Sequence, residues 1–163
     1  NMVTKRPVRL QTLSMLDLQM RTVLWDIGSC TGSVSIEAKS QYPDLDIVAF
    51  ERRPEGEELL RQNSIKWGTP GIRFVGGDFL ELPLGDLPRP DAVFIGGHGG
   101  WLVELLKRID EVLLPGGVIV FNSVSEDSLQ QFYEGVTQVG RRVTERIRLA
   151  VDAHNPIEIL KAE

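Results

Sequence analysis

The chain has 163 residues, of which 42% are hydrophobic and 25% are charged, as expected for one globular domain with a sizeable core. Its formal net charge of −5 argues against a protein that binds nucleic acid, because phosphate contacts need clustered Lys and Arg. The single cysteine, Cys30, excludes an internal disulfide and suits a reducing cytoplasm, and the two histidines are too few to predict a metal site. No apolar run approaches the roughly 18 residues of a membrane span. We expect one cytoplasmic domain over residues 1–163, with no metal, nucleic-acid or membrane partner.

Apolar runs and helical periodicities alternate along the chain. Pro7 fits the first turn of a helix over about residues 5–20, whose buried stripe includes Leu13, Leu16 and Met20. A later helix, over residues 54–68, is expected to turn Leu60 and Ile65 inward. The remaining helices are expected over residues 33–42, 101–114 and 126–139, and strands over residues 22–27, 46–50, 72–75, 91–95, 118–121, 143–151 and 157–160.

Alternation of strands and helices, followed by two final strands, predicts an α/β fold. The expected architecture is a doubly wound, mostly parallel, seven-stranded Rossmann-like sheet with an antiparallel terminal hairpin. In such a sheet, ligands bind beyond the carboxyl ends of the strands, where the strand order reverses.

The segment VLWDIGSCTG, at residues 23–32, indicates a buried strand, a tight glycine turn and the start of a helix. Glycines let the backbone approach a ligand, and amides at the helix start face it. The next strand ends in Glu51, 19 residues after Gly32, and a carboxylate there suits the two hydroxyls of a ribose. Together these features favour a cofactor that contains adenosine.

The spacing of the glycines distinguishes between adenosine cofactors. A dinucleotide site has G-x-G-x-x-G, but here Cys30 and Ser33 stand at the second and third glycine positions. The pattern fits better the D-x-G-x-x-x-G loop of enzymes that use S-adenosylmethionine (SAM). We expect Asp26 near the ammonium group of SAM and the loop itself around its amino-acid tail, through Gly28, Ser29, Cys30, Thr31 and Gly32. The alternative is a plain strand–turn–helix connection that needs glycine.

Further candidates follow other strands. Glu51 is the expected ribose ligand, although a solvated acid paired with Arg52 or Arg53 is the alternative. Asp78 is a candidate acceptor for the adenine amino group, with the Phe79 amide near a ring nitrogen. The alternative for Asp78 is a turn residue that bonds its own backbone.

Four glycines in residues 96–100 predict close backbone approach or a flexible lid, with Gly96 and Gly97 near the cofactor. His98 in this loop is a candidate to orient a substrate or move a proton, or else a surface histidine. The basic residues near the N-terminus and in the strand over residues 143–151 are candidates to bind carboxylates of a substrate, against the alternative of a solvated charged face. They are Lys5, Arg6, Arg9, Arg146 and Arg148. For Cys30 we favour a small turn residue over a nucleophile.

These segments resemble the decarboxylating precorrin or cobalt-precorrin C15-methyltransferases of cobalamin (vitamin B12) biosynthesis, free-standing or as the C-terminal half of a C5,15-methyltransferase. The resemblance covers nearly the whole chain. Its motifs are TKRPVR at residues 4–9, WDIG at 25–28, TGSVSIE at 31–37, ER at 51–52, GD at 77–78, DAVFIGG at 91–97, LPGG at 114–117 and NPI at 155–157.

The resemblance implies that Thr4, the loop from Gly28 to Gly32, Glu51 and Phe79 contact SAM. It also implies methyl transfer to C15 of the tetrapyrrole, loss of CO2 from its C12 acetate, and a homotetramer. The family loop usually has glycine where this chain has Cys30. Two alternatives stay open: a SAM-dependent methyltransferase for another small molecule or RNA, and a SAM-binding module without turnover.

Overall fold

The computed structural model describes residues 4–163. Its helices are α1 (Arg6–Leu16), the short 3₁₀ helix η1 (Leu18–Met20), α2 (Ser33–Gln41), α3 (Gly56–Trp67), α4 (Leu102–Val112) and α5 (Glu126–Gln138). Its strands are β1 (Val23–Ile27), β2 (Asp46–Glu51), β3 (Arg73–Gly76), β4 (Ala92–Ile95), β5 (Val118–Ser123), β6 (Val143–Leu149) and β7 (Ile157–Ala162).

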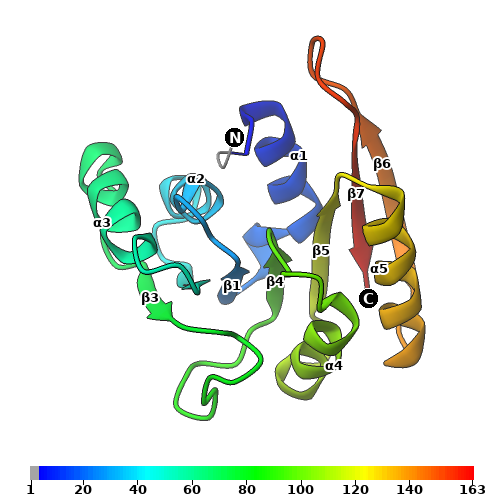
Figure 1. Ribbon diagram of the computed structural model, residues 1–163. Coiled ribbons are helices and arrows are strands. Elements are labelled where there is room, and N and C mark those ends of the chain that lie inside the picture. The colour runs from blue at the N-terminus through cyan, green and yellow to red at the C-terminus, as the bar shows by residue number, and fades with distance from the viewer. Residues whose placement is uncertain (1–3) are drawn as a thin grey trace.

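The seven strands form one sheet in the order β3-β2-β1-β4-β5-β7-β6. Strands β1 to β5 pair in parallel, whereas β7 runs antiparallel to both β5 and β6. Helices α1, α2 and α3 cover one face of the sheet, and α4 and α5 cover the other (Figure 1). The predicted doubly wound α/β fold with an antiparallel terminal hairpin is confirmed.

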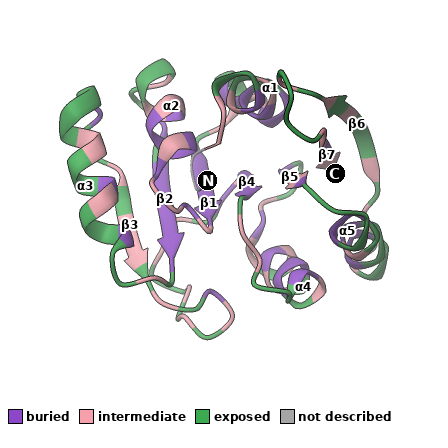
Figure 2. Cartoon of the chain, turned by 45° about the horizontal axis from the view of Figure 1, so that its top comes forward, coloured by how far each residue is buried: buried purple, intermediate pink, exposed green. Residues whose placement is uncertain are grey.

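Strand β1 lies in the middle of the sheet, and all five of its residues are buried. Its side chains alternate between the faces: Leu24 packs in the core under α1 and α2, while Trp25 packs in the core under α4 and α5. The Trp25 ring lies 5.0 Å from Phe50, and its indole nitrogen donates to the Pro88 carbonyl at 3.0 Å. Figure 2 shows that burial is concentrated in β1, β2, β4 and β5, so the carboxyl ends of these strands are held by a well-packed core.

The structure corrects the sequence prediction at two helices. The predicted helix over residues 5–20 ends at Leu16, because Asp17 adopts a left-handed backbone with φ of 53°, and Met20 beyond it is 70% exposed. Ile65 was expected to face inward, but it is 69% exposed. Helix α3 covers the edge of the sheet near β3, and of its residues only Gly56 and Leu60 are buried by the described chain. Among residues 4–163, no helix is long and apolar enough to cross a bilayer.

Candidate functional site

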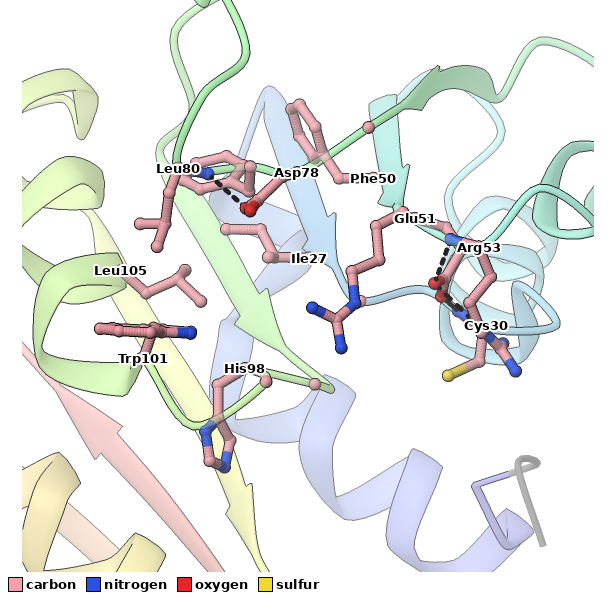
Figure 3. Close-up of a pocket in the computed structure, with 16 residues that line it drawn as sticks. Ile27, Cys30, Phe50, Glu51, Arg53, Asp78, Leu80, His98, Trp101 and Leu105 are labelled. Carbon is pink, nitrogen blue, oxygen red and sulfur yellow. Dashed lines mark hydrogen bonds and ion pairs between the residues drawn. The ribbon is translucent and has the colours of Figure 1, made fainter.

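A pocket of about 320 Å³ opens beyond the carboxyl ends of β1 to β4, at the reversal of strand order between β1 and β4 (Figure 3). This volume is in the range of small-molecule sites, and the position is where an α/β sheet binds its ligand. We call it the rim pocket. It is lined by Ile27, Gly28, Cys30, Phe50, Glu51, Arg52, Arg53, Gly77, Asp78, Phe79, Leu80, Gly97, His98, Gly99, Trp101 and Leu105.

The loops after β1 and β4 touch each other at the floor of the rim pocket. The amides of Gly28 and Ser29 both donate to the Phe50 carbonyl at 2.9 Å, and the Gly96 amide donates to the Ile27 carbonyl at 2.8 Å. Gly28 has φ of +73°, and a Cβ atom on it would lie 2.6 Å from the Gly97 nitrogen. Only glycine allows this approach, and both Gly28 and Gly97 line the rim pocket.

Glu51 ends β2 inside the rim pocket, and only 6% of the residue is exposed. Its Oε2 accepts from the Cys30 amide at 2.8 Å, while Oε1 accepts from the Arg53 amide at 3.1 Å and from Arg53 Nε at 3.2 Å. Burial raises the pKa of Glu51, but these hydrogen bonds outweigh burial and the pKa lies below its usual value. Glu51 is thus paired with Arg53, as in the alternative considered from the sequence, but it is not solvated. The carboxylate is buried and ionised, and Oε2 can accept a further hydrogen bond.

The turn after β3 forms another side of the rim pocket. The exposed Asp78 accepts at Oδ1 from the Leu80 amide at 3.0 Å. This hydrogen bond is the one expected if Asp78 is a turn residue rather than an adenine ligand. The Phe79 ring packs at 5.0 Å against Phe50 and at 6.0 Å against Trp25, so it belongs to the core. Arg108 stacks on the Phe79 ring at 5.6 Å and donates to the carbonyls of Phe79 and Leu82, which holds this turn in place.

The loop from β4 to α4 brings His98 and Trp101 to the rim pocket. His98 Nδ1 accepts from the Gly100 amide at 3.1 Å, and the ring lies edge-on to Phe121 at 5.7 Å. Burial lowers the pKa of His98, so the imidazole is neutral at pH 7 with its proton on Nε2. Trp101 is 56% exposed and lies beside Leu105 in Figure 3, where the two form an apolar wall.

The predicted site residues separate into two groups. Those lining the rim pocket are Gly28, Cys30, Glu51, Asp78, Phe79, Gly97 and His98. Those outside its lining are Thr4, Lys5, Arg9, Asp26, Ser29, Thr31, Gly32 and Gly96. Leu80, Trp101 and Leu105 also line the rim pocket, although no sequence motif predicted them. The one signal for Trp101 was its position next to the glycine-rich loop.

Several predicted residues outside the lining of the rim pocket are buried in β1 or in the loop after it. Asp26 is 1% exposed; its Oδ2 accepts from the Ser35 hydroxyl at 2.6 Å, and Oδ1 has no hydrogen-bond partner among residues 4–163. Burial raises the pKa of Asp26 to about 6. The hydroxyls of Ser29 and Thr31 are likewise buried without a partner in the described chain. Three buried polar atoms without a partner among residues 4–163 therefore lie in or next to the loop after β1, which is unusual for a folded protein.

A second cavity, of about 520 Å³, lies between α1, α2 and α3. We call it the helix pocket. It is lined by Arg6, Arg9, Thr31, Ser33, Ile36, Glu37, Ser40, Asn63 and Trp67. Arg9, one of the predicted substrate residues, therefore belongs to this cavity rather than to the rim pocket.

The residues of the rim pocket fit SAM. The ionised Glu51 carboxylate suits ribose hydroxyls, the glycine backbone permits close approach, and Leu80 and Leu105 provide an apolar surface for adenine. Cys30 is in a left-handed conformation with φ of 55°, which explains why glycine suits this position. Burial and the nearby Glu51 raise the pKa of the Cys30 thiol, which argues against a nucleophile. Within residues 4–163, no group of three His, Cys, Asp or Glu side chains is arranged to hold a metal ion.

Comparisons with known proteins identify the family of the chain. A family model described as a precorrin methyltransferase domain matches residues 1–162. The chain is 34% identical over 155 residues to the cobalt-precorrin-6B C(15)-methyltransferase (decarboxylating) of Salmonella typhimurium, which covers 95% of this chain and 79% of that protein. It is 38% identical over 125 residues to the precorrin-6Y C(5,15)-methyltransferase (decarboxylating) of a Sinorhizobium species, covering 77% of this chain and 30% of that longer protein.

A solved structure gives the same result in three dimensions. The crystal structure of a precorrin-6y C5,15-methyltransferase from Geobacter metallireducens has a TM-score of 0.90 to this chain at 38% identity, covering 100% of this chain and 90% of the other. The fold agrees with that of this structure, and the family model matches nearly every residue. The chain belongs to the precorrin methyltransferase family.

Proposed function

We propose that this protein transfers a methyl group from SAM to C15 of a precorrin or cobalt-precorrin and removes CO2 from the C12 acetate, in cobalamin biosynthesis. The names of the relatives support the reaction and its substrate class. The observation that carries the cofactor assignment is the buried, ionised Glu51 at the end of β2 in the rim pocket.

In this proposal the chain binds and orients the reactants. Glu51 accepts hydrogen bonds from the ribose, and its own bonds to Cys30 and Arg53 fix the carboxylate beforehand. The apolar wall of Trp101 and Leu105 excludes water from the reacting atoms. When bound, SAM supplies a methyl group on a positively charged sulfur that the electron-rich carbon of the tetrapyrrole attacks. Holding the two in line provides much of the rate, and no strong base is required.

Decarboxylation breaks the bond between the acetate methylene and its carboxylate. CO2 leaves, the electron pair passes into the conjugated macrocycle, and a proton then completes the new methyl group. The chain must orient the carboxylate, and the rim pocket has Arg52 and the neutral His98 beside the cofactor site for this purpose.

Substitution of Glu51 tests the cofactor site. We expect Glu51→Gln, which keeps the side-chain shape but loses the charge, to weaken SAM binding about tenfold or more, because hydrogen bonds to a charged group contribute about 1.5–3 kcal/mol. Calorimetric titration of SAM measures the change. Glu57→Gln, on the exposed side of α3 outside both pockets, is the matched control. Unchanged affinity in Glu51→Gln would contradict the assignment.

The reaction is tested by incubating the protein with a precorrin-type tetrapyrrole and labelled SAM, followed by mass spectrometry. The expected product has one added methyl group and one carboxyl group fewer. SAM binding without turnover on any tetrapyrrole would indicate a binding module, and labelling of another small molecule or RNA would indicate a different methyltransferase.

We further infer that the protein works in the cytoplasm as a homo-oligomer, a homotetramer by family resemblance. A reducing compartment suits its single free cysteine, Cys30. Sedimentation analysis of the purified protein measures the assembly, and a monomer at micromolar concentration would contradict the inference.

A further inference from the structure

The helix pocket is positively charged and rich in hydrogen-bond donors. Arg9 donates to Glu37 at 3.3 Å and to the Thr4 carbonyl at 2.7 Å, so the one acid of this cavity is already paired. Arg6, the first residue of α1, is exposed and makes no hydrogen bond or ion pair to residues 4–163. One guanidinium group is therefore left to meet an anion.

Neutral polar groups and one aromatic ring complete the helix pocket. The Thr31 hydroxyl is buried and has no partner in the described part of the chain. Asn63, on α3, donates to the Thr31 carbonyl at 3.0 Å, which joins the far wall of the cavity to the loop after β1. Trp67, also on α3, is 64% exposed and presents an apolar surface beside these polar groups. This mixture of a cation, hydroxyls and an aromatic ring suits a large organic acid better than a small inorganic ion.

The helix pocket and the rim pocket share one loop. Cys30 lines the rim pocket, and the next residue, Thr31, lines the helix pocket. The two linings therefore adjoin, because consecutive Cα atoms are about 3.8 Å apart, and a ligand that contacts both must be much larger than one residue. A tetrapyrrole has this size, and its acetate and propionate side chains extend outward from the ring.

We propose that the helix pocket binds peripheral carboxylates of the tetrapyrrole while the ring itself meets the methyl donor at the rim pocket. Arg6 is the main cation of this subsite, and Arg9 a second one whose guanidinium is shared with Glu37. The inference rests on the proposed function and assigns a specificity-determining contact to residues outside the cofactor site.

Charge changes at Arg6 test this subsite, because replacing Arg6 disrupts no hydrogen bond or ion pair within residues 4–163. We expect Arg6→Gln to raise the KM for the tetrapyrrole about threefold to fivefold, the effect of one partly exposed ion pair, and Arg6→Glu to raise it about tenfold or more. Arg6→Lys should restore most of the affinity. The Kd for SAM and the value of kcat should stay within twofold of the wild type in all three variants. Arg73→Gln removes the same charge at the exposed start of β3, outside both pockets and without a hydrogen bond or ion pair to residues 4–163, and is the matched control.

Binding of uroporphyrin, a porphyrin with acetate and propionate side chains, gives a second measurement that needs no turnover. Its affinity, followed by quenching of protein fluorescence, should fall in Arg6→Glu and fall with added salt in the wild type. Equal KM and equal uroporphyrin affinity in wild type and Arg6→Glu would overturn the inference. So would a change in sedimentation at unchanged KM, which would assign Arg6 to a subunit contact. Absence of methyl transfer by the wild type would instead contradict the proposed function.

Discussion

The two glycine-rich loops at the rim pocket differ in what their glycines contact. In the loop after β1, a Cβ atom on Gly28 would lie within 2.8 Å of three backbone atoms of Gly97. In the loop after β4, Gly100 has φ of +86°, but a Cβ atom on it would have no neighbour within 4 Å. The first loop thus needs glycine for packing, whereas the end of the second needs it only for backbone conformation and leaves open space beside the pocket. A rigid floor and an unfilled side are what a cofactor and a large substrate require.

The largest expected effect tests the packed loop. Gly28→Ala combines a clash with backbone atoms and an unfavourable positive φ, so we expect the free energy of unfolding to fall by at least about 3 kcal/mol. Urea denaturation followed by circular dichroism measures this change, and SAM binding should be lost with it. A variant with wild-type stability would show that the two loops can separate at no cost.

The next effect tests how β1 supports the first loop. Asp26 has an ordinary pKa of 3.8, which burial raises to about 6 in the folded chain. The unfolded chain therefore releases this proton first as the pH rises, so the group's contribution to stability decreases between about pH 4 and pH 6, by up to about 3 kcal/mol. Asp26→Asn should remove this decrease.

Urea denaturation of wild type and Asp26→Asn at pH 4 and pH 7 measures the difference. Asp46→Asn, an exposed carboxylate at the start of β2, serves as the control. The same loss of stability with pH in wild type and Asp26→Asn would show that Asp26 ionises normally in the folded protein.

A smaller effect is expected in the open loop. The new Cβ atom in Gly100→Ala contacts no other atom, so the cost comes only from the left-handed backbone conformation. We expect the free energy of unfolding to fall by about 1–2 kcal/mol. The comparison with Gly28→Ala under identical conditions sharpens the contrast between the loops. Equal decreases in the free energy of unfolding of Gly28→Ala and Gly100→Ala would show that the two loops do not differ in this way.

The smallest effect concerns Cys30, which is left-handed at φ of 55° although it is not glycine. Cys30→Gly relieves about 1–2 kcal/mol of strain but adds the entropy cost of glycine, so we expect a net gain of at most about 1 kcal/mol. Thermal unfolding and SAM titration of the variant measure it. Destabilisation by Cys30→Gly would show that the half-buried thiol contributes packing that outweighs its strain.

Local patterns in the sequence predicted the sheet and much of the rim pocket. The apolar run of β1, the glycines after it and Glu51 at the end of β2 are local signals, because each reflects burial or backbone conformation of a few neighbouring residues. Met20 and Ile65 were misplaced because helical periodicity does not reveal where a helix ends or how much of its surface finds a partner.

The sequence by itself determined that this is an α/β chain whose strand ends carry glycines and a carboxylate suited to an adenosine cofactor. Only the tertiary structure decided that Glu51 is buried and hydrogen-bonded to Cys30 and Arg53, that Trp101 lines the rim pocket, and that Arg6, Thr31 and Trp67 share a second cavity. The physical reason is that local backbone preference depends on adjacent residues, whereas a cavity depends on elements far apart in sequence that packing brings together.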